Sequence, residues 1–479
     1  MLRISKLSRG RADYYLLPTG VLGNRQVEPA GKWMGQGSSR LKLQGDVDKE
    51  RWYSVLAGID PTTGNVLSAS QGRVKVSGFD LTFCAPKSVS LLAGIGEKEV
   101  SLATVASHDR AVSTALDYLE CHGMAVRRTS ATHEKLILPV EGIVGANFLH
   151  RTTRSLDPHL HTHSVVANLG SDLENNWSAL DGRGLYAHRA AADALYHAVL
   201  RYELGSQLGV EWEQPVNGRA DIKGIPREII LEFSTRTAQI TAYLETRGID
   251  TSSRANYIAG AATRPEKDLD ISVDDLVGQW RDRAMSMGMG PVQLDQVIGR
   301  CHMDRAEYSD TIIQSYDKVL ESLAEKDGSV CRRDILRAWS AALVAGAPGD
   351  EINRVVDSVI GFATIDNDAR RGLGIGVREE RVEAFAIESA IMTRVDGSRE
   401  SALQGLLDRI GPRPEDEHRL AIWSEAYKDI CRYSERASEA GSSLRQRVEA
   451  NDIERLISQT RLQLQLGHEG YQIEYGIGF

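Results

Sequence analysis

Three histidines within one short stretch constrain this chain more than any other feature of its sequence. His161 and His163 are two residues apart, so on a β-strand their side chains point to the same face. Upstream, residues 143–152 have the composition of a second strand, and an Asp-Pro pair typical of a turn separates the two. The stretch therefore predicts a β-hairpin that folds His150 back beside the other two histidines.

Three imidazoles on one sheet face can hold a divalent metal ion. Such a site keeps open coordination positions, as a catalytic metal needs, whereas structural zinc sites are closed by four protein ligands. The five cysteines are scattered without paired spacing, which argues against a zinc ribbon and suits a reducing cytoplasm. The alternative is a half-buried strand whose histidines only face solvent. We favour the metal site.

The histidine stretch also resembles a known motif. His150 followed by Asp157-Pro158-His159-Leu160-His161-Thr162-His163 resembles the three-histidine motif of the MobF-type conjugative relaxases, which are HUH endonucleases that nick single-stranded DNA. The resemblance implies an α+β HUH relaxase fold, in which a central antiparallel β-sheet carries the histidines and helices pack around it. It also implies that His150, His161 and His163 bind Mg²⁺ or Mn²⁺.

Two adjacent tyrosines follow a first predicted strand at residues 2–8. A phenol is a poor nucleophile at its ordinary pKa near 10, so such a pair alone suggests only packing. MobF relaxases, however, carry their nucleophile in an N-terminal Tyr-Tyr pair. The resemblance implies that Tyr14 attacks the scissile phosphate and that Tyr15 is its substitute or support. The best-known members have a second pair a few residues on, whereas here the next tyrosine is Tyr53.

Residues 78–84 alternate between apolar and polar side chains, which predicts a strand with a core face and a polar face. Pro86 should end this strand, and Ser88 should cap the helix that follows. The resemblance implies that Asp80, on the polar face, lies next to the histidines and the tyrosine. There it would orient a ligand imidazole and accept the tyrosine proton.

Helical periodicity predicts an amphipathic helix after Asp48 and longer helices at residues 96–122, 185–208 and 229–247. The last two resemble segments that close over single-stranded DNA in MobF relaxases, where aromatic and arginine side chains contact bases and phosphates. The alternative is a helical subdomain that only packs on the sheet. The DNA-contact candidates nearer the metal site are Lys87, Arg151 and Arg154.

Charge is unevenly distributed along the chain, whose 479 residues predict two or three domains. Residues 1–160 contain 20 Lys and Arg against 15 Asp and Glu, whereas residues 301–479 contain 23 against 32. The C-terminal part thus accounts for the whole net charge of −9. The mild basic excess beside the predicted metal site is compatible with a phosphate-binding surface.

The resemblance covers about the first 295 residues, so we predict a relaxase domain at 1–295 and a mostly helical region at 296–479. Residues 328–339 resemble the opening of the helicase half of longer MobF proteins. No Walker A motif follows, because the only Gly-Lys pair, Gly31-Lys32, precedes a tryptophan. We therefore expect no ATP, and interpret 296–479 as a helicase remnant or an interaction module.

These features predict a conjugative relaxase that nicks and rejoins single-stranded DNA at a transfer origin through a 5′-phosphotyrosyl intermediate. The alternatives are a rolling-circle replication initiator with the same chemistry and a non-catalytic origin-binding remnant. Expected partners are accessory DNA-binding proteins, type IV secretion coupling proteins and a helicase acting in trans. We expect no membrane insertion or signal peptide, and a place in the bacterial cytoplasm with transfer alongside the DNA.

Overall fold

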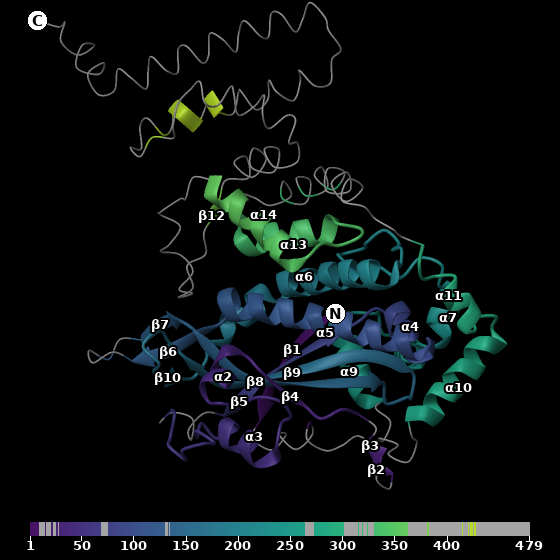
Figure 1. The fold of residues 1–479 in the computed structure, drawn as a ribbon, viewed down its shortest axis with the longest axis horizontal. Helices are drawn as coiled ribbons and strands as arrows, with labels where there is room; N and C mark the ends of the chain where they lie inside the picture. Colours follow the sequence, from purple (N-terminus) through teal and green to yellow (C-terminus); the bar gives the residue numbers. More distant parts are fainter. Residues whose placement is uncertain are drawn as a thin grey trace, which may run out of the picture. The chain divides into compact units, whose positions relative to one another are not determined.

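The computed structural model describes residues 1–8, 15, 21–22, 25–26, 28–68, 75–129, 133, 135–263, 273–300, 315, 319, 323, 330–362, 381–382, 414, 420, 422–424 and 426–427. The chain divides into two compact units, one of residues 1–356 and 366–381 and one of residues 357–365 and 382–479. Figure 1 shows the described residues in colour, and nearly all of them belong to the first unit. The functional boundary predicted at residue 295 stays a prediction.

An antiparallel sheet forms the centre of the first unit. Its strands lie in the order β1 (Leu2–Ser8), β5 (Val76–Cys84), β9 (Pro158–Ser171), β8 (Gly142–Thr152) and β4 (Lys32–Met34), and β10 (Trp177–Ser178) pairs with β9. Separate two-stranded ribbons are β2 (Val21–Leu22) with β3 (Arg25–Gln26) and β6 (Ala125–Thr129) with β7 (Lys135–Pro139). The predicted central antiparallel sheet is thus confirmed.

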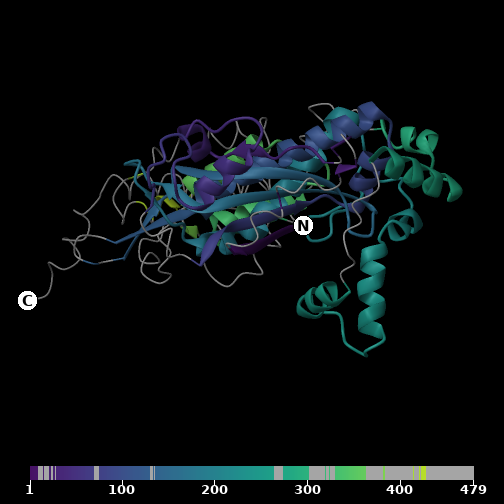
Figure 2. The ribbon, with the colours of Figure 1, turned by 90° about the horizontal axis from the view of Figure 1, so that it is seen from below.

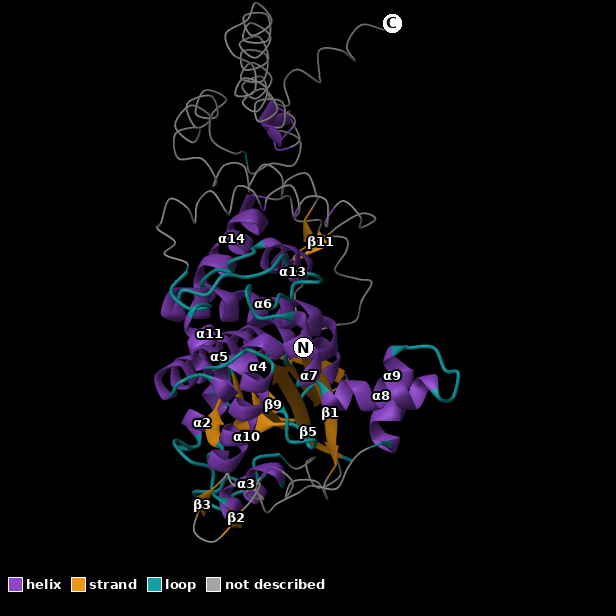
Figure 3. Ribbon diagram, turned by 90° about the vertical axis from the view of Figure 1, so that its right-hand side faces the viewer, coloured by secondary structure: helices purple, strands orange, loops and turns teal. Residues whose placement is uncertain are grey.

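Helices make up much of the rest of the described chain, and several cover the faces of this sheet (Figure 3). They are α2 (Gln36–Arg40), α3 (Lys49–Leu56), α4 (Lys87–Ile95), α5 (Lys98–Tyr118), α6 (Gly182–Leu208), α7 (Arg227–Glu232), α8 (Thr235–Glu245), α9 (Ser253–Ala262), α10 (Val273–Ser286), α11 (Pro291–Asp295), α13 (Arg332–Ala342) and α14 (Gly349–Phe362). A π-helical turn, η3 (Leu119–Gly123), continues α5, and the remaining short strands are β11 (Val330–Cys331) and β12 (Arg381–Val382). None of the helices in the described part of the chain is long and apolar enough to cross a membrane.

One face of the sheet packs against α4, α5 and α6. Phe79, Leu81 and Phe83 of β5 are at most 4% exposed on this side, as their alternation predicted. The Phe83 ring lies 5.4 Å from the ring of Tyr196 on α6, measured between centroids. Helix α6 ends at Gly209, whose left-handed backbone (φ 62°) is favoured in glycine. This face supplies the larger part of the helix–sheet packing that holds β5 and β9 in place.

The opposite face carries a second apolar cluster beneath α3, a helix that Asp48 caps through the backbone N–H of Arg51. From α3, β8 and β9 the cluster contains Trp52, Val55, Leu56, Val144, Ala146, Phe148, Val165, Ala167 and Leu169. Along β9 this same face then changes from Val165 to His163 and His161. The histidines therefore lie at the edge of a packed core, on a strand that is packed against other elements on both faces of the sheet.

Two local predictions are wrong. Ser88 does not cap α4, whose N-cap is Pro86; instead the Ser88 hydroxyl donates to Asp221 Oδ1 at 2.7 Å. The helix predicted over residues 229–247 is interrupted between α7 and α8. The backbone N–H of Thr235 bonds to the side chain of Asp157 rather than to the preceding helical turn, so a new helix starts there.

Candidate metal and nucleophile site

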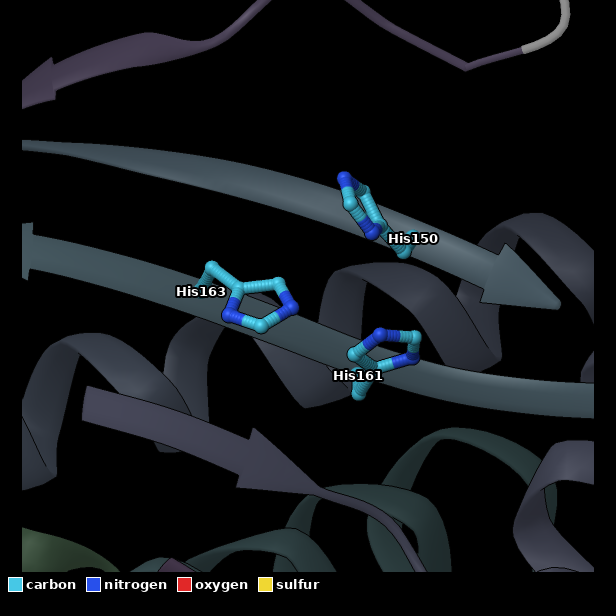
Figure 4. Close-up of side chains that lie close together, drawn as sticks. All are labelled: His150, His161 and His163. Carbon is cyan, nitrogen blue, oxygen red and sulfur yellow. The ribbon is translucent and has the colours of Figure 1, made fainter. Parts of the chain in front are cut away.

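The predicted hairpin brings the three histidines together. In the antiparallel register of β8 and β9, His150 lies directly opposite His161, and His163 follows two residues along the same face. One nitrogen from each ring lies within 4.8 Å of the others. The rings surround a common point, as Figure 4 shows, with centroids 5.1 to 5.3 Å apart. This arrangement can hold one metal ion through three imidazoles.

Hydrogen bonds determine which nitrogen each ring presents. His163 Nδ1 lies 2.9 Å from Asp80 Oδ1, and His161 Nδ1 lies 2.9 Å from the carbonyl oxygen of His159. Both partners are acceptors, so each Nδ1 must carry the hydrogen and donate it. The Nε2 atoms of His161 and His163 are then left with their lone pairs. Carboxylate–histidine and carbonyl–histidine pairs of this kind orient metal ligands and raise their basicity.

Burial favours the neutral form of two histidines on β9, His161 and His159. Burial, together with a smaller effect of the neighbouring His163, lowers the pKa of His161 to about 4. His159 stacks on His161 with centroids 4.7 Å apart, and burial likewise lowers its pKa well below the usual value. A metal ligand has to be deprotonated, so His161 is ready to bind a cation at neutral pH without releasing a proton.

A tyrosine reaches the same site. The Tyr15 hydroxyl donates to Asp80 Oδ2 at 2.8 Å, and the Tyr15 ring lies against those of Phe148 and His163, at centroid distances of 5.6 and 5.4 Å. Asp80 thus bridges one member of the tyrosine pair and one candidate metal ligand. Tyr14, for which nucleophilic attack is predicted, lies outside the described residues.

Thr82 belongs to this network and was missed by the sequence analysis. Its hydroxyl donates to Asp80 Oδ1 at 3.2 Å and lies 3.2 Å from His163 Nδ1. A signal was available, because Thr82 is two residues from Asp80 on a strand and so shares its face. Thr82 and Tyr15 together fix the orientation of the carboxylate that holds His163.

Lys87 holds the histidine strand rather than facing solvent. Its Nζ donates to the carbonyl oxygen of Pro158, the first residue of β9, at 2.7 Å. Burial lowers the pKa of Lys87 to about 8, although the neighbouring Asp157 raises it. The positive charge is thus close to the histidines, and the ammonium is already engaged with the backbone.

The other two DNA-contact candidates differ in position. The Arg151 charge acts on Asp109 of α5, lowering the pKa of a carboxyl that burial raises to about 6. Its backbone N–H donates to Glu28 Oε1. Arg154 is half-buried in the turn between the two histidine strands. Arg151 is in strand β8 and Arg154 is in the turn after it, so both lie on the segment between His150 and His161.

Comparisons with known proteins agree with this geometry. A family described as TrwC relaxase matches residues 5–287. The multifunctional conjugation protein TraI of Escherichia coli is 33% identical over 267 residues, which is 53% of this chain but only 14% of that relative. TraI of Escherichia coli strain K12 is 32% identical over the same length.

Two solved structures match this chain over nearly their whole length, unlike the two TraI proteins. The conjugative relaxase TrwC in a copper-bound complex with oriT DNA has a TM-score of 0.55 and 31% identity, and the match covers 60% of this chain and 99% of that one. TrwC complexed with a 27-mer DNA that comprises the recognition hairpin and the cleavage site has a TM-score of 0.53 and 30% identity, with the same coverage.

Proposed function

Because the chain belongs to the TrwC relaxase family, we propose that it nicks and rejoins one DNA strand at a transfer origin. The observation that carries this proposal is a single site in which Tyr15, Asp80 and three histidines are joined by hydrogen bonds and ring contacts. A phenol bonded to a carboxylate beside a metal site is the arrangement that phosphoryl transfer to tyrosine requires.

His150, His161 and His163 would hold a divalent ion, for which we propose Mg²⁺ or Mn²⁺. The support comes from the clustering of the three imidazoles and from the Nδ1–H groups of His161 and His163, which are already engaged with acceptors. When bound, the ion supplies stabilisation of the negative charge on the scissile phosphate. The chain's own part is to present three nitrogens and to hold them in place through Asp80, Thr82 and the β9 backbone.

Tyr14 is the proposed nucleophile, and Tyr15 its support through Asp80. The tyrosine oxygen forms a bond to the phosphorus while the bond to the 3′ oxygen breaks, leaving a 5′-phosphotyrosine and a free 3′-OH. Asp80 is proposed to accept the phenolic proton, since it already accepts a hydrogen bond from one tyrosine of the pair. No water is consumed, so the same steps in reverse rejoin the strand.

Single-stranded DNA is the proposed substrate, and Lys87, Arg151 and Arg154 are its proposed contacts. Accessory DNA-binding proteins, secretion coupling proteins and a helicase acting in trans are further proposed partners of the protein. The free thiols of Cys84, Cys121 and Cys331 are compatible with work in the cytoplasm.

A denaturing gel tests the proposal. The protein is mixed with Mg²⁺ or Mn²⁺ and single-stranded oligonucleotides that cover the DNA flanking its own gene. We expect a covalent protein–DNA band that disappears with EDTA and with Tyr14→Phe but persists, at reduced intensity, with Tyr15→Phe. Loss of the band in Tyr15→Phe alone would move the nucleophile to Tyr15. Native binding without any covalent band would indicate a non-catalytic DNA-binding protein.

A further inference from the structure

The turn between the two histidine strands contains a buried carboxylate, that of Asp157, which makes no hydrogen bond within the turn. The turn is held by Thr153, whose hydroxyl accepts the backbone N–H groups of Ser155 and Asp157. Leu156 adopts a positive φ of 61° within it. The Asp157 side chain, by contrast, makes its hydrogen bonds outside the turn, although the residue is only 1% exposed. A buried carboxylate requires partners.

Its first partner is the start of α8. The backbone N–H of Thr235 donates to Asp157 Oδ2 at 2.8 Å, and the Thr235 hydroxyl donates to Oδ1 at 3.1 Å. Helix α8 lacks a cap of its own, since Ser234 makes no capping hydrogen bond and the first turn contains no acidic residue. Asp157 therefore caps α8 from another segment, where a negative charge also interacts favourably with the helix dipole.

The second partner is α10. Arg283 NH1 lies 3.2 Å from Asp157 Oδ1, while Arg283 Nε donates to Glu232 at the end of α7. Three residues earlier, Trp280 Nε1 donates to the carbonyl oxygen of Leu156 at 2.7 Å. One helix thus holds both the histidine turn and the α7–α8 junction, with Asp157 between them.

Helices α8 and α9 form a pair that projects from the sheet and its covering helices in two perpendicular views (Figures 2 and 3). The direction of this pair depends on the junction at Asp157. Its loop exposes Arg247, stacked 3.7 Å over the Tyr243 ring. An element that projects in this way keeps its direction only through its base. The base of α8 is bonded to the residue that immediately precedes the histidine strand β9.

We propose that Asp157 is a positioning residue that sets the direction in which the α8–α9 pair leaves the histidine turn and thereby controls how tightly substrate DNA is held. This inference rests on the proposed nicking function for its kinetic consequence, but not for its structural one. Loss of the Asp157 carboxylate frees α8–α9 and weakens DNA binding, while the three histidines keep their metal.

The test uses the full chain with Asp157→Asn, and Thr235→Ala as a milder variant that removes only one of the hydrogen bonds. We expect faster amide hydrogen exchange confined to residues 235–262 and unchanged Mn²⁺ affinity. The KM for the cleaved oligonucleotide should rise roughly 2- to 30-fold, the equivalent of one lost helix cap, with kcat retained. Thr235→Ala should show the same pattern at smaller size.

Asp172→Asn is the matched control, because Asp172 directly follows β9 at its other end. It is 3% exposed and likewise accepts backbone N–H groups, from Glu174 and Asn176, and an arginine, Arg128. Unchanged exchange at 235–262 in Asp157→Asn, or an equal rise in KM with Asp172→Asn, overturns the proposal. If the wild-type protein makes no covalent adduct, the proposed function fails while the exchange experiment still decides the role of Asp157.

Discussion

The two faces of the central sheet both contain buried histidines, yet they use them in opposite ways. On the helix-packed face, His108 of α5 has both ring nitrogens engaged, at 2.8 Å from the Tyr196 hydroxyl and at 2.8 Å from the Thr162 hydroxyl. On the other face, His161 bonds through Nδ1 to a carbonyl and turns Nε2 toward the other two histidines. Burial lowers the pKa of both, to about 3 and about 4.

The difference teaches that burial makes an imidazole neutral, whereas the neighbouring groups decide what a neutral imidazole can do. His108 is a connector, since both of its nitrogens are satisfied within the fold. His161 and His163 are candidate ligands, because each engages Nδ1 with an acceptor and lies with His150 in one cluster of imidazoles. Thr162 lies between them on β9 and bonds to His108 on the helix-packed face. The packing of that face therefore holds in place the strand that carries His161 and His163 on the other face.

The largest expected effect tests whether the helix-packed face is purely structural. Phe83→Ala should lower the free energy of unfolding by about 3–5 kcal/mol, because it leaves a cavity in a fully buried site. Denaturant unfolding measures this, with Leu102→Ala, at an exposed position, as the control. The folded variant should bind Mn²⁺ as the wild type does; a matching loss of metal affinity would show that the faces are not separable.

A smaller effect is expected from Asp80→Asn on the histidine face. The amide has one acceptor oxygen and one donor NH2 in place of two acceptor oxygens, so His163 loses its charged partner. We expect Mn²⁺ affinity, measured by titration calorimetry, to fall about 10- to 100-fold, roughly 1.4–2.7 kcal/mol. Asp46→Asn, which changes an exposed ion pair with Lys32, should leave the affinity unaltered. Unchanged affinity in Asp80→Asn would contradict the proposed role.

The smallest effect concerns pH. The folded-state pKa of His108 lies below its ordinary value near 6.5, so the unfolded chain takes up a proton first as the pH falls. The stabilisation of the fold by neutral His108 is therefore fully present above pH 6.5 and is lost as the pH falls toward 3. Between pH 7 and pH 5.5 the titration of His108 should lower the free energy of unfolding by about 1 kcal/mol.

His108→Gln keeps a side chain that can bond to Thr162 and Tyr196 but does not titrate. Its free energy of unfolding should therefore depend less steeply on pH over this interval, as measured by urea denaturation at several pH values. His133→Gln, at an exposed position, is the control. An identical pH dependence in wild type and His108→Gln would mean that His108 is protonated in the folded state or does not differ from the unfolded chain.

Local patterns in the sequence predicted the histidine site, because its geometry follows from strand alternation and one turn. His161 and His163 share a face by spacing, and the Asp-Pro turn returns His150 to them. Asp80 could be assigned to the site only through the family resemblance, since a carboxylate on a strand looks the same whether or not a histidine lies beside it.

The parts that could not be predicted depend on partners far along the chain. Ser88 looked like a helix cap, but its hydroxyl bonds to Asp221, which is 133 residues away. The break between α7 and α8 has no local signal, because apolar periodicity continues through Phe233. Its cause, the bond from Thr235 to Asp157, spans 78 residues.

Arg201 has a practical consequence for how this protein can be divided into fragments. Its guanidinium, in a residue 1% exposed, donates to the carbonyl oxygens of Gly218, Ser340 and Leu343, the last two at the end of α13. The family match ends at residue 287, well before that helix. A recombinant fragment cut there would lose α13, which packs against α6 and contains the buried Trp339 and Leu336, and would leave Arg201 and the α6 surface uncovered. Exposed apolar surface of this kind promotes aggregation. A fragment meant for crystallisation or assay should therefore extend beyond Leu343.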